Sequence, residues 1–264
     1  MHPRLVAAVL VFMTACLPDT VDLRYAFEEG TTTVYSMTAR ADASWDVRGA
    51  GRGSYEVGFE VTETVTQVDD DGAVVEVQMI PTGAEERGLP SPGLERRSFS
   101  LRLDPEGEVT EVLQLDGIRA VALDEDELAF IGTYRPSLPR EPVTLRDEWS
   151  ESREIRMGTE TQGIDTTGRL VAFRRDDGRE LAEVVFSGNS PLRWITALPQ
   201  GEAELSGEAT TRGRGLFEID GGLLDSATSR TTGRFDVRVV PGAGQAPITG
   251  VLRLDLALEV ERSD

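Results

Sequence analysis

The chain has 264 residues, of which 47 are acidic and 27 basic, giving a formal net charge of -20. A surface this acidic repels phosphate backbones, so we exclude nucleic acid as a partner, and it disfavours wide contact with anionic lipid headgroups. The composition is 39% hydrophobic and 28% charged, which fits a folded protein.

Catalytic and metal-binding side chains are scarce. The chain contains no Lys, one His (His2) and one Cys (Cys16). Ser-His-Asp triads, Cys-His dyads, Lys Schiff bases and His/Cys zinc sites therefore lack their residues. Chemistry by a pair of carboxylates stays open, because 47 acids make some close pair expected. We predict no enzyme, no catalytic residue, no cofactor and no metal site.

The amino-terminal segment has the pattern of a secretory leader. Arg4 and the free amino group supply positive charge, and an uninterrupted apolar or small run follows from residue 5 to residue 15. Eleven residues extend about 16 Å as a helix, roughly half the thickness of a bilayer core. We therefore predict that residues 1–15 are a signal peptide and not a membrane span.

Met13-Thr14-Ala15-Cys16 resembles the bacterial lipobox, although Met13 departs from the favoured Leu. The resemblance implies cleavage before Cys16 and lipidation of its thiol by fatty acyl chains such as palmitate. Each buried methylene contributes about 0.8 kcal/mol, so two or three chains anchor a protein durably to a membrane. Residues 16–20 are then a tether. Leu17 replaces the Asp that favours inner-membrane retention, so we expect the outer membrane of the cell envelope.

Period-two alternation dominates the remaining chain and predicts strands with one buried face. The inner faces begin with Tyr25, Phe27 and Tyr35 and continue with alternating apolar residues at 55–61, 73–79, 99–103, 235–239 and 252–260. One-sided alternation is typical of an antiparallel sheet that is wet on one side. Trp45, Trp149 and Trp194 are interpreted as core residues, with stacking on a ligand as the alternative.

Four Asp- and Gly-containing turns predict hairpins between the strands. Asp70-Asp71-Gly72 and Asp176-Asp177-Gly178 lie 106 residues apart, and Asp104-Pro105-Glu106-Gly107 and Asp220-Gly221-Gly222 follow at a similar offset. This order predicts an internal duplication of about 110 residues. The predicted halves are residues 21–138 and 139–264.

Three segments interrupt the alternation. Apolar residues near helical spacing predict one helix near 117–130, with Asp116 as its N-cap, lying as a lid on the sheet. Residues 81–92 are rich in Gly and Pro and predict a loop. Pro136, Pro139 and Pro142 predict an extended crossover at the boundary between the halves.

Two acidic runs are weighed as cation sites. Residues 69–72 read Asp-Asp-Asp-Gly, and residues 124–127 read Asp-Glu-Asp-Glu. A Ca²⁺ site needs several oxygens converging on one point, and the spaced pattern of a calcium loop is absent. We interpret the first run as a hairpin tip and the second as a solvated helix face.

The predicted fold is mainly β, or α+β if the helix forms, with a curved antiparallel sheet or half-barrel. The lipobox, the paired turns and the segment 138–143 (Leu-Pro-Arg-Glu-Pro-Val) before Asp147-Glu148-Trp149 resemble bacterial lipoproteins of duplicated β-sheet type. The architecture is also similar to the LolA/LppX group, and that resemblance implies a half-barrel around an acyl chain.

Two functions follow as hypotheses. The first is a non-catalytic binding module for a lipid or other apolar ligand, with the faces 252–260 and 73–79 lining an unfilled cavity of several hundred cubic ångströms. The alternative is a structural lipoprotein with a closed core that contacts another envelope protein through a patch or strand edge. Both hypotheses place the body in the periplasm or outside the cell, attached to the membrane through Cys16.

Overall fold

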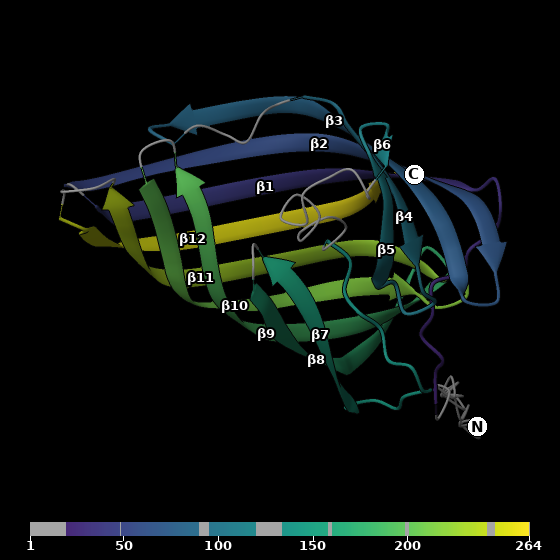
Figure 1. Ribbon diagram of the computed structural model, residues 1–264. Helices are drawn as coiled ribbons and strands as arrows, with labels where there is room; N and C mark the ends of the chain where they lie inside the picture. Colours follow the sequence, from purple (N-terminus) through teal and green to yellow (C-terminus); the bar gives the residue numbers. More distant parts are fainter. Residues whose placement is uncertain are drawn as a thin grey trace, which may run out of the picture.

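A computed structural model describes residues 20–47, 49–89, 95–119, 134–157, 160–198, 201–241 and 246–263. The predicted signal peptide, Cys16 and all of the tether except Thr20 lie outside the described residues. The described residues form twelve β-strands and no helix, and Figure 1 shows these strands as one strongly curved sheet.

The strands are long, and several reach 17 to 20 residues. Their bounds are β1 Thr32–Asp46, β2 Ala50–Asp69, β3 Gly72–Arg87, β4 Arg97–Leu103, β5 Val109–Leu115, β6 Ile118–Arg119, β7 Glu148–Met157, β8 Glu160–Asp176, β9 Arg179–Leu198, β10 Gly201–Glu218, β11 Leu223–Pro241 and β12 Ile248–Ser263.

All neighbouring strands pair antiparallel in the order β6-β5-β4-β3-β2-β1-β12-β11-β10-β9-β8-β7. The first and last strands of the chain, β1 and β12, meet at the centre of the sheet. β6 and β7 form its two edges and do not pair with each other, so the sheet is open. This confirms the predicted mainly β, curved antiparallel sheet.

The strands fall into two six-strand meanders, β1–β6 and β7–β12, which run in the same direction along the sheet. A corresponding contact occurs in each. Val65 of β2 exchanges backbone hydrogen bonds with Gly30 and Thr31 just before β1, at 2.9 and 3.0 Å. Leu170 of β8 does the same with Arg146 and Asp147 just before β7, at 2.8 and 3.2 Å. The duplication that would explain this correspondence remains a prediction.

The four predicted hairpin turns connect β2 to β3, β4 to β5, β8 to β9 and β10 to β11. The helix predicted near 117–130 is wrong at its start. Asp116 and Gly117 have φ of 50° and 80°, the backbone of a two-residue hairpin turn, and Ile118 returns as β6 to pair with Leu115. The Asp116 carboxylate accepts a 2.8 Å hydrogen bond from the Ser98 amide instead of capping a helix. Residues 120–130 lie outside the described part of the chain.

The loop predicted at 81–92 is also wrong over its first seven residues, because β3 continues through Arg87. Pro81 lies opposite Phe59, beside a register shift at Gly58/Phe59. β4 pairs with β3 only over residues 73–79, so no β4 residue pairs with Pro81. Proline is tolerated at such a position because it removes no ladder hydrogen bond.

The hydrophobic core occupies one end of the sheet, which we call the closed end. It lies beside the four hairpin turns, and two extended segments cross it. Residues 20–27 bridge the sheet through hydrogen bonds from Tyr25 N to the Pro105 carbonyl at 2.8 Å and from Ala26 N to the Gly222 carbonyl at 2.9 Å. Val21 pairs with Val143 of the second segment, residues 134–143. Leu23 and Leu138, one on each segment, are fully buried in the core.

A buried ion pair joins the second segment to the sheet. The side chains of Arg135 and Glu63 are 6% and 7% exposed and hydrogen-bond to each other. The Arg135 guanidinium lies 5.2 Å from the ring centroid of Tyr25, and the Tyr134 hydroxyl donates to Glu63. Burial raises the pKa of Tyr25, Tyr35 and Tyr134, so these hydroxyls stay protonated. The cluster fixes where the crossover enters the core.

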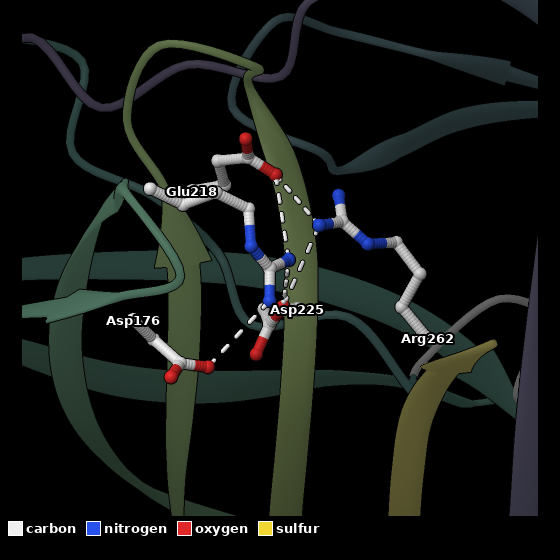
Figure 2. Close-up of polar contacts among 5 residues, drawn as sticks. Asp176, Glu218, Asp225 and Arg262 are labelled. Carbon is white, nitrogen blue, oxygen red and sulfur yellow. Dashed lines mark hydrogen bonds and ion pairs between the residues drawn. The ribbon is translucent and has the colours of Figure 1, made fainter. Parts of the chain in front are cut away.

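A second ion cluster ties the strand ends together at the same end of the sheet (Figure 2). Asp225 accepts from Arg179 at 2.7 Å, and Glu218 accepts from Arg262 at 2.6 Å. Asp176 of β8 lies 3.6 Å from Arg179. The cluster therefore spans five neighbouring strands, from β8 to β12, with three of its side chains less than a fifth exposed.

Candidate functional site

The inner face continues beyond the core toward the opposite end of the sheet, which we call the open end. β12 shows the change along one strand. Val260 is 3% exposed and belongs to the core, whereas the four leucines that follow it on the same face toward the open end are only half-buried. These leucines, which we call the leucine ridge, are Leu252, Leu254, Leu256 and Leu258.

Small side chains flank the leucine ridge on both sides. On β1, Ala41 lies in register between Leu256 and Tyr55 and is buried. On the other side, three strands carry only small residues over a stretch of the inner face, and all of them are half-buried. This strip, which we call the trough, comprises Gly188 and Ser190 of β9, Ala209, Thr211 and Gly213 of β10, and Ser229, Thr231 and Gly233 of β11.

Aromatic rings lie flat on glycines along this inner face. The Phe186 ring covers Gly213, and the Phe235 ring covers Gly233 and Gly207. A Cβ added at any of these glycines would overlap the ring. The rings therefore occupy the space above these glycines at the two ends of the trough, as aromatic residues commonly do over glycines of a neighbouring strand.

Two tryptophans repeat the arrangement outside the trough. Trp45 lies over Gly51, its partner on β2, and Trp149 lies over Gly168, its partner on β8. Trp149 also packs against the core and donates to the Ser137 carbonyl at 3.4 Å. Trp194, on β9, is 36% exposed. Trp45 and Trp149 thus pack against neighbouring residues, whereas Trp194 is partly exposed. The interpretation of all three as core residues therefore does not hold for Trp194.

The trough is wide, shallow and uncharged. Three strands give a width of about 10 Å, and five residues of strand give a length of about 15 Å. Its polar groups are hydroxyls, and those of Thr211 and Thr231 hydrogen-bond to each other at 2.8 Å. No residue of the trough or of the leucine ridge is ionisable. Such a surface presents small, uncharged side chains.

The sequence analysis predicts an unfilled cavity lined by the faces 252–260 and 73–79, but Ala73, Val75 and Val77 of the second face are buried in the core. A hollow at the closed end, beside Tyr25, Tyr35 and Val65, holds only about 30 Å³. This is far below the several hundred cubic ångströms that a lipid chain needs. The half-buried inner face at the open end is therefore the part of the core-facing surface that side chains fill least.

A separate hollow of about 590 Å³ lies beside edge strand β7 and contains a pair of carboxyl groups. Burial and contact with Glu108 raise the pKa of Glu151 from 4.5 to about 7. The Ser137 hydroxyl donates to Glu108 at 3.0 Å, and Arg140 lies 4.0 Å from Glu151. A glycosidase holds its carboxyls roughly 5 Å or more apart across a cleft, whereas these two groups touch. The pair joins the β4–β5 turn to β7.

The segment 138–143 and Asp147-Glu148-Trp149, singled out in the sequence, line this same hollow from residue 139 onward. Asp69, weighed as a calcium ligand, pairs with Arg102 at 2.7 Å, which lowers its pKa. No three His, Cys, Asp or Glu side chains converge on one point among the described residues. In the same part of the chain, no helix is long and apolar enough to cross a membrane.

Comparison with known proteins adds no identity. No family model matches the chain, and no curated protein matches it. The site therefore rests on its own geometry.

Sequence reasoning identified the leucine ridge but missed the trough. The trough residues are Gly, Ala, Ser and Thr, which alternate with polar residues and give no apolar periodicity. The signal that was present is three strand glycines, Gly168, Gly207 and Gly213, each of which lies opposite an aromatic residue on a neighbouring strand. Only the register of the strands reveals that pairing.

Proposed function

We propose that the protein is a lipid-anchored envelope protein that holds an apolar ligand, such as a lipid acyl chain, in the trough without catalysis. The observation that carries the proposal is the half-buried apolar inner face at the open end, beside a fully packed closed end. A protein whose only purpose is a closed structure gains stability by filling such a face with larger side chains.

The physical driving force is burial of apolar surface. Each square ångström of apolar surface removed from water contributes about 25 cal/mol, and the leucine ridge and the half-buried Phe186 ring supply that surface. The small side chains of the trough leave space above the sheet, so an acyl chain can lie along the strands there. The hydroxyls of Thr211 and Thr231 hydrogen-bond to each other, so one of their two O–H donors already has an acceptor when a ligand covers them.

Native mass spectrometry of the mature protein, extracted from its membrane in mild detergent, tests the ligand. We expect a bound lipid mass that activation in the gas phase removes. Thr231→Trp fills the trough and should abolish that mass, whereas Thr228→Trp, on the exposed outer face of the same strand, should retain it. If both variants retain the lipid, the proposal is contradicted. A stable complex with another envelope protein, and no lipid, would favour the structural alternative.

Anchoring is tested separately. Growth with a clickable palmitate analogue should label the wild-type protein and leave Cys16→Ser unlabelled. A wild-type protein without label contradicts the anchor but leaves the trough proposal standing, so the two claims fail independently.

A further inference from the structure

The outer face of the sheet carries a row of arginines near the open end, on the side opposite the trough. Arg234 of β11 lies directly opposite Arg253 of β12, Arg253 lies opposite Ser44 of β1, and Ser44 lies opposite Arg52 of β2. Arg87 lies near the end of β3. Its neighbour Glu86 pairs with Tyr55 of the inner face, so the Arg87 side chain projects from the outer face. Four guanidinium groups therefore project from neighbouring strands on one face.

Three of these arginines lack a partner. Within the part of the chain that the structure describes, no hydrogen bond or ion pair involves the side chain of Arg52, Arg234 or Arg253. This is unexpected in a chain with 47 acids and 27 bases. Like charges directly opposite each other destabilise a sheet, and Arg234 lies between Arg253 on β12 and Glu208 on β10. Glu208 offsets part of the repulsion at Arg234, and an anion at Arg253 would relieve the rest.

A depression of about 810 Å³ lies among these residues, and Arg52, Arg87 and Arg253 line it. Its floor carries the small hydroxyl side chains Ser44, Ser54 and Thr232, which can donate further hydrogen bonds. The long arginine side chains stand around this floor, so their heads can converge above Ser44.

The acidic groups at the depression do not neutralise the row. Asp255 is held by Arg230 at 2.7 Å, and Glu85 lies 3.2 Å from Arg87 with both side chains largely exposed. Asp42 remains on the floor beside Ser44 and Ser54. Two unpaired guanidiniums in the depression face the carboxylate of Asp42, and Arg234 beside them lies opposite Glu208 of β10.

We propose that this depression is a binding site for a phosphate group, held by Arg52 and Arg253 above Ser44, with Arg87 and Arg234 in support. Guanidinium groups bind phosphate oxygens through paired hydrogen bonds, and serine hydroxyls add further donors. The site lies on the face opposite the trough, so it stands or falls independently of the proposed function.

Isothermal titration of the mature protein at low ionic strength with inorganic phosphate and with glycerol phosphate tests the site. Arg52→Gln and Arg253→Gln should each weaken binding about tenfold. Arg212→Gln removes another exposed, unpaired arginine of the same face and should leave binding unchanged. Circular dichroism of each variant reports whether the sheet is intact.

A second arm identifies the source of the phosphate. The protein is sedimented with vesicles that contain phosphatidic acid and, in parallel, with vesicles of neutral lipid. Binding to the phosphatidic acid vesicles, without binding of free glycerol phosphate, identifies a lipid headgroup as the ligand. Binding of free glycerol phosphate without vesicle binding supports a soluble ester. Failure of both probes to bind the wild-type protein, or equal loss of binding in Arg212→Gln and Arg253→Gln, overturns the proposal.

Discussion

The two ends of the same strands differ in how far the inner face is filled. At the closed end, Tyr35, Leu101 and Phe217 point inward and are at most 2% exposed. At the open end, the same face of the sheet carries Gly, Ala, Ser and Thr beside a half-buried leucine ridge. The hydrogen-bond ladder continues through both ends. The two ends therefore differ in packing because their side chains differ in volume and because the crossing segments cover only the closed end, while the backbone hydrogen bonding is the same.

The crossing segments explain why the closed end can bury charge. Arg135 enters the core on the segment 134–143 and meets Glu63 where little water reaches. A buried pair contributes little net stability but is costly to break, because the remaining charge is left without a partner. The stability of the closed end thus depends on a buried charge pair, and the following variants compare the two ends in stability.

The largest effect is expected from Arg135→Met. It leaves the Glu63 carboxylate buried without its ion partner, so the free energy of unfolding should fall by about 3–5 kcal/mol in urea titrations. The control is Arg40→Met, which removes an exposed ion pair with Glu56 and should change the free energy of unfolding little, because solvent screens that pair. Equal losses would mean that the closed end does not isolate this pair from water.

Core truncation compares the ends directly. Leu224→Ala, at 1% exposure, should lower the free energy of unfolding by about 2–5 kcal/mol, because it removes packed methyl groups and leaves a cavity. Leu254→Ala, on the half-buried leucine ridge, should cost only about 1 kcal/mol. A cost at Leu254 as large as that at Leu224 would show that the open end is filled in solution.

The glycines beneath the rings give a third test. Gly168→Ala displaces the Trp149 ring and should cost about 1–3 kcal/mol, with a change in tryptophan fluorescence. The control, Gly163→Ala on the same strand, meets no atom within 4 Å and should leave stability and fluorescence nearly unchanged. Equal changes in stability and fluorescence in the two variants would contradict the contact between the Trp149 ring and Gly168.

The smallest effect concerns pH. The pKa of Glu151 is about 7 in the folded protein against 4.5 in the unfolded chain, so the folded state binds more protons between these values. This contribution to stability is fully present below pH 4.5 and is lost as pH rises through about 7. Allowing for screening by solvent, it amounts to about 1–2 kcal/mol. Glu151→Gln should remove this slope from urea midpoints measured at pH 5 to 8, and a slope that persists would assign it to other groups.

These contrasts also show what the sequence can predict. Alternation at 252–260 and the four Asp- and Gly-containing turns predicted an antiparallel sheet with the correct hairpins. The extent of β8–β11 was not predictable in this way, since small residues at positions such as Thr211 and Gly213 hide the alternation. The helix prediction is wrong at its start, because Asp116 and Gly117 adopt positive φ and form a hairpin turn there. Glu63 sits among surface-like threonines, so its burial becomes apparent only when Arg135 is brought to it from 72 residues away.

Photocrosslinking measures most directly whether the open end holds an apolar chain. The mature protein would be incubated with a diazirine-bearing fatty acid, irradiated, and digested for mass spectrometry. The account predicts crosslinks on peptides of β9–β12 that contain the trough and the leucine ridge, with competition by unlabelled fatty acid and loss in Thr231→Trp. Crosslinks confined to the closed end or the outer face, or spread without competition, would contradict it.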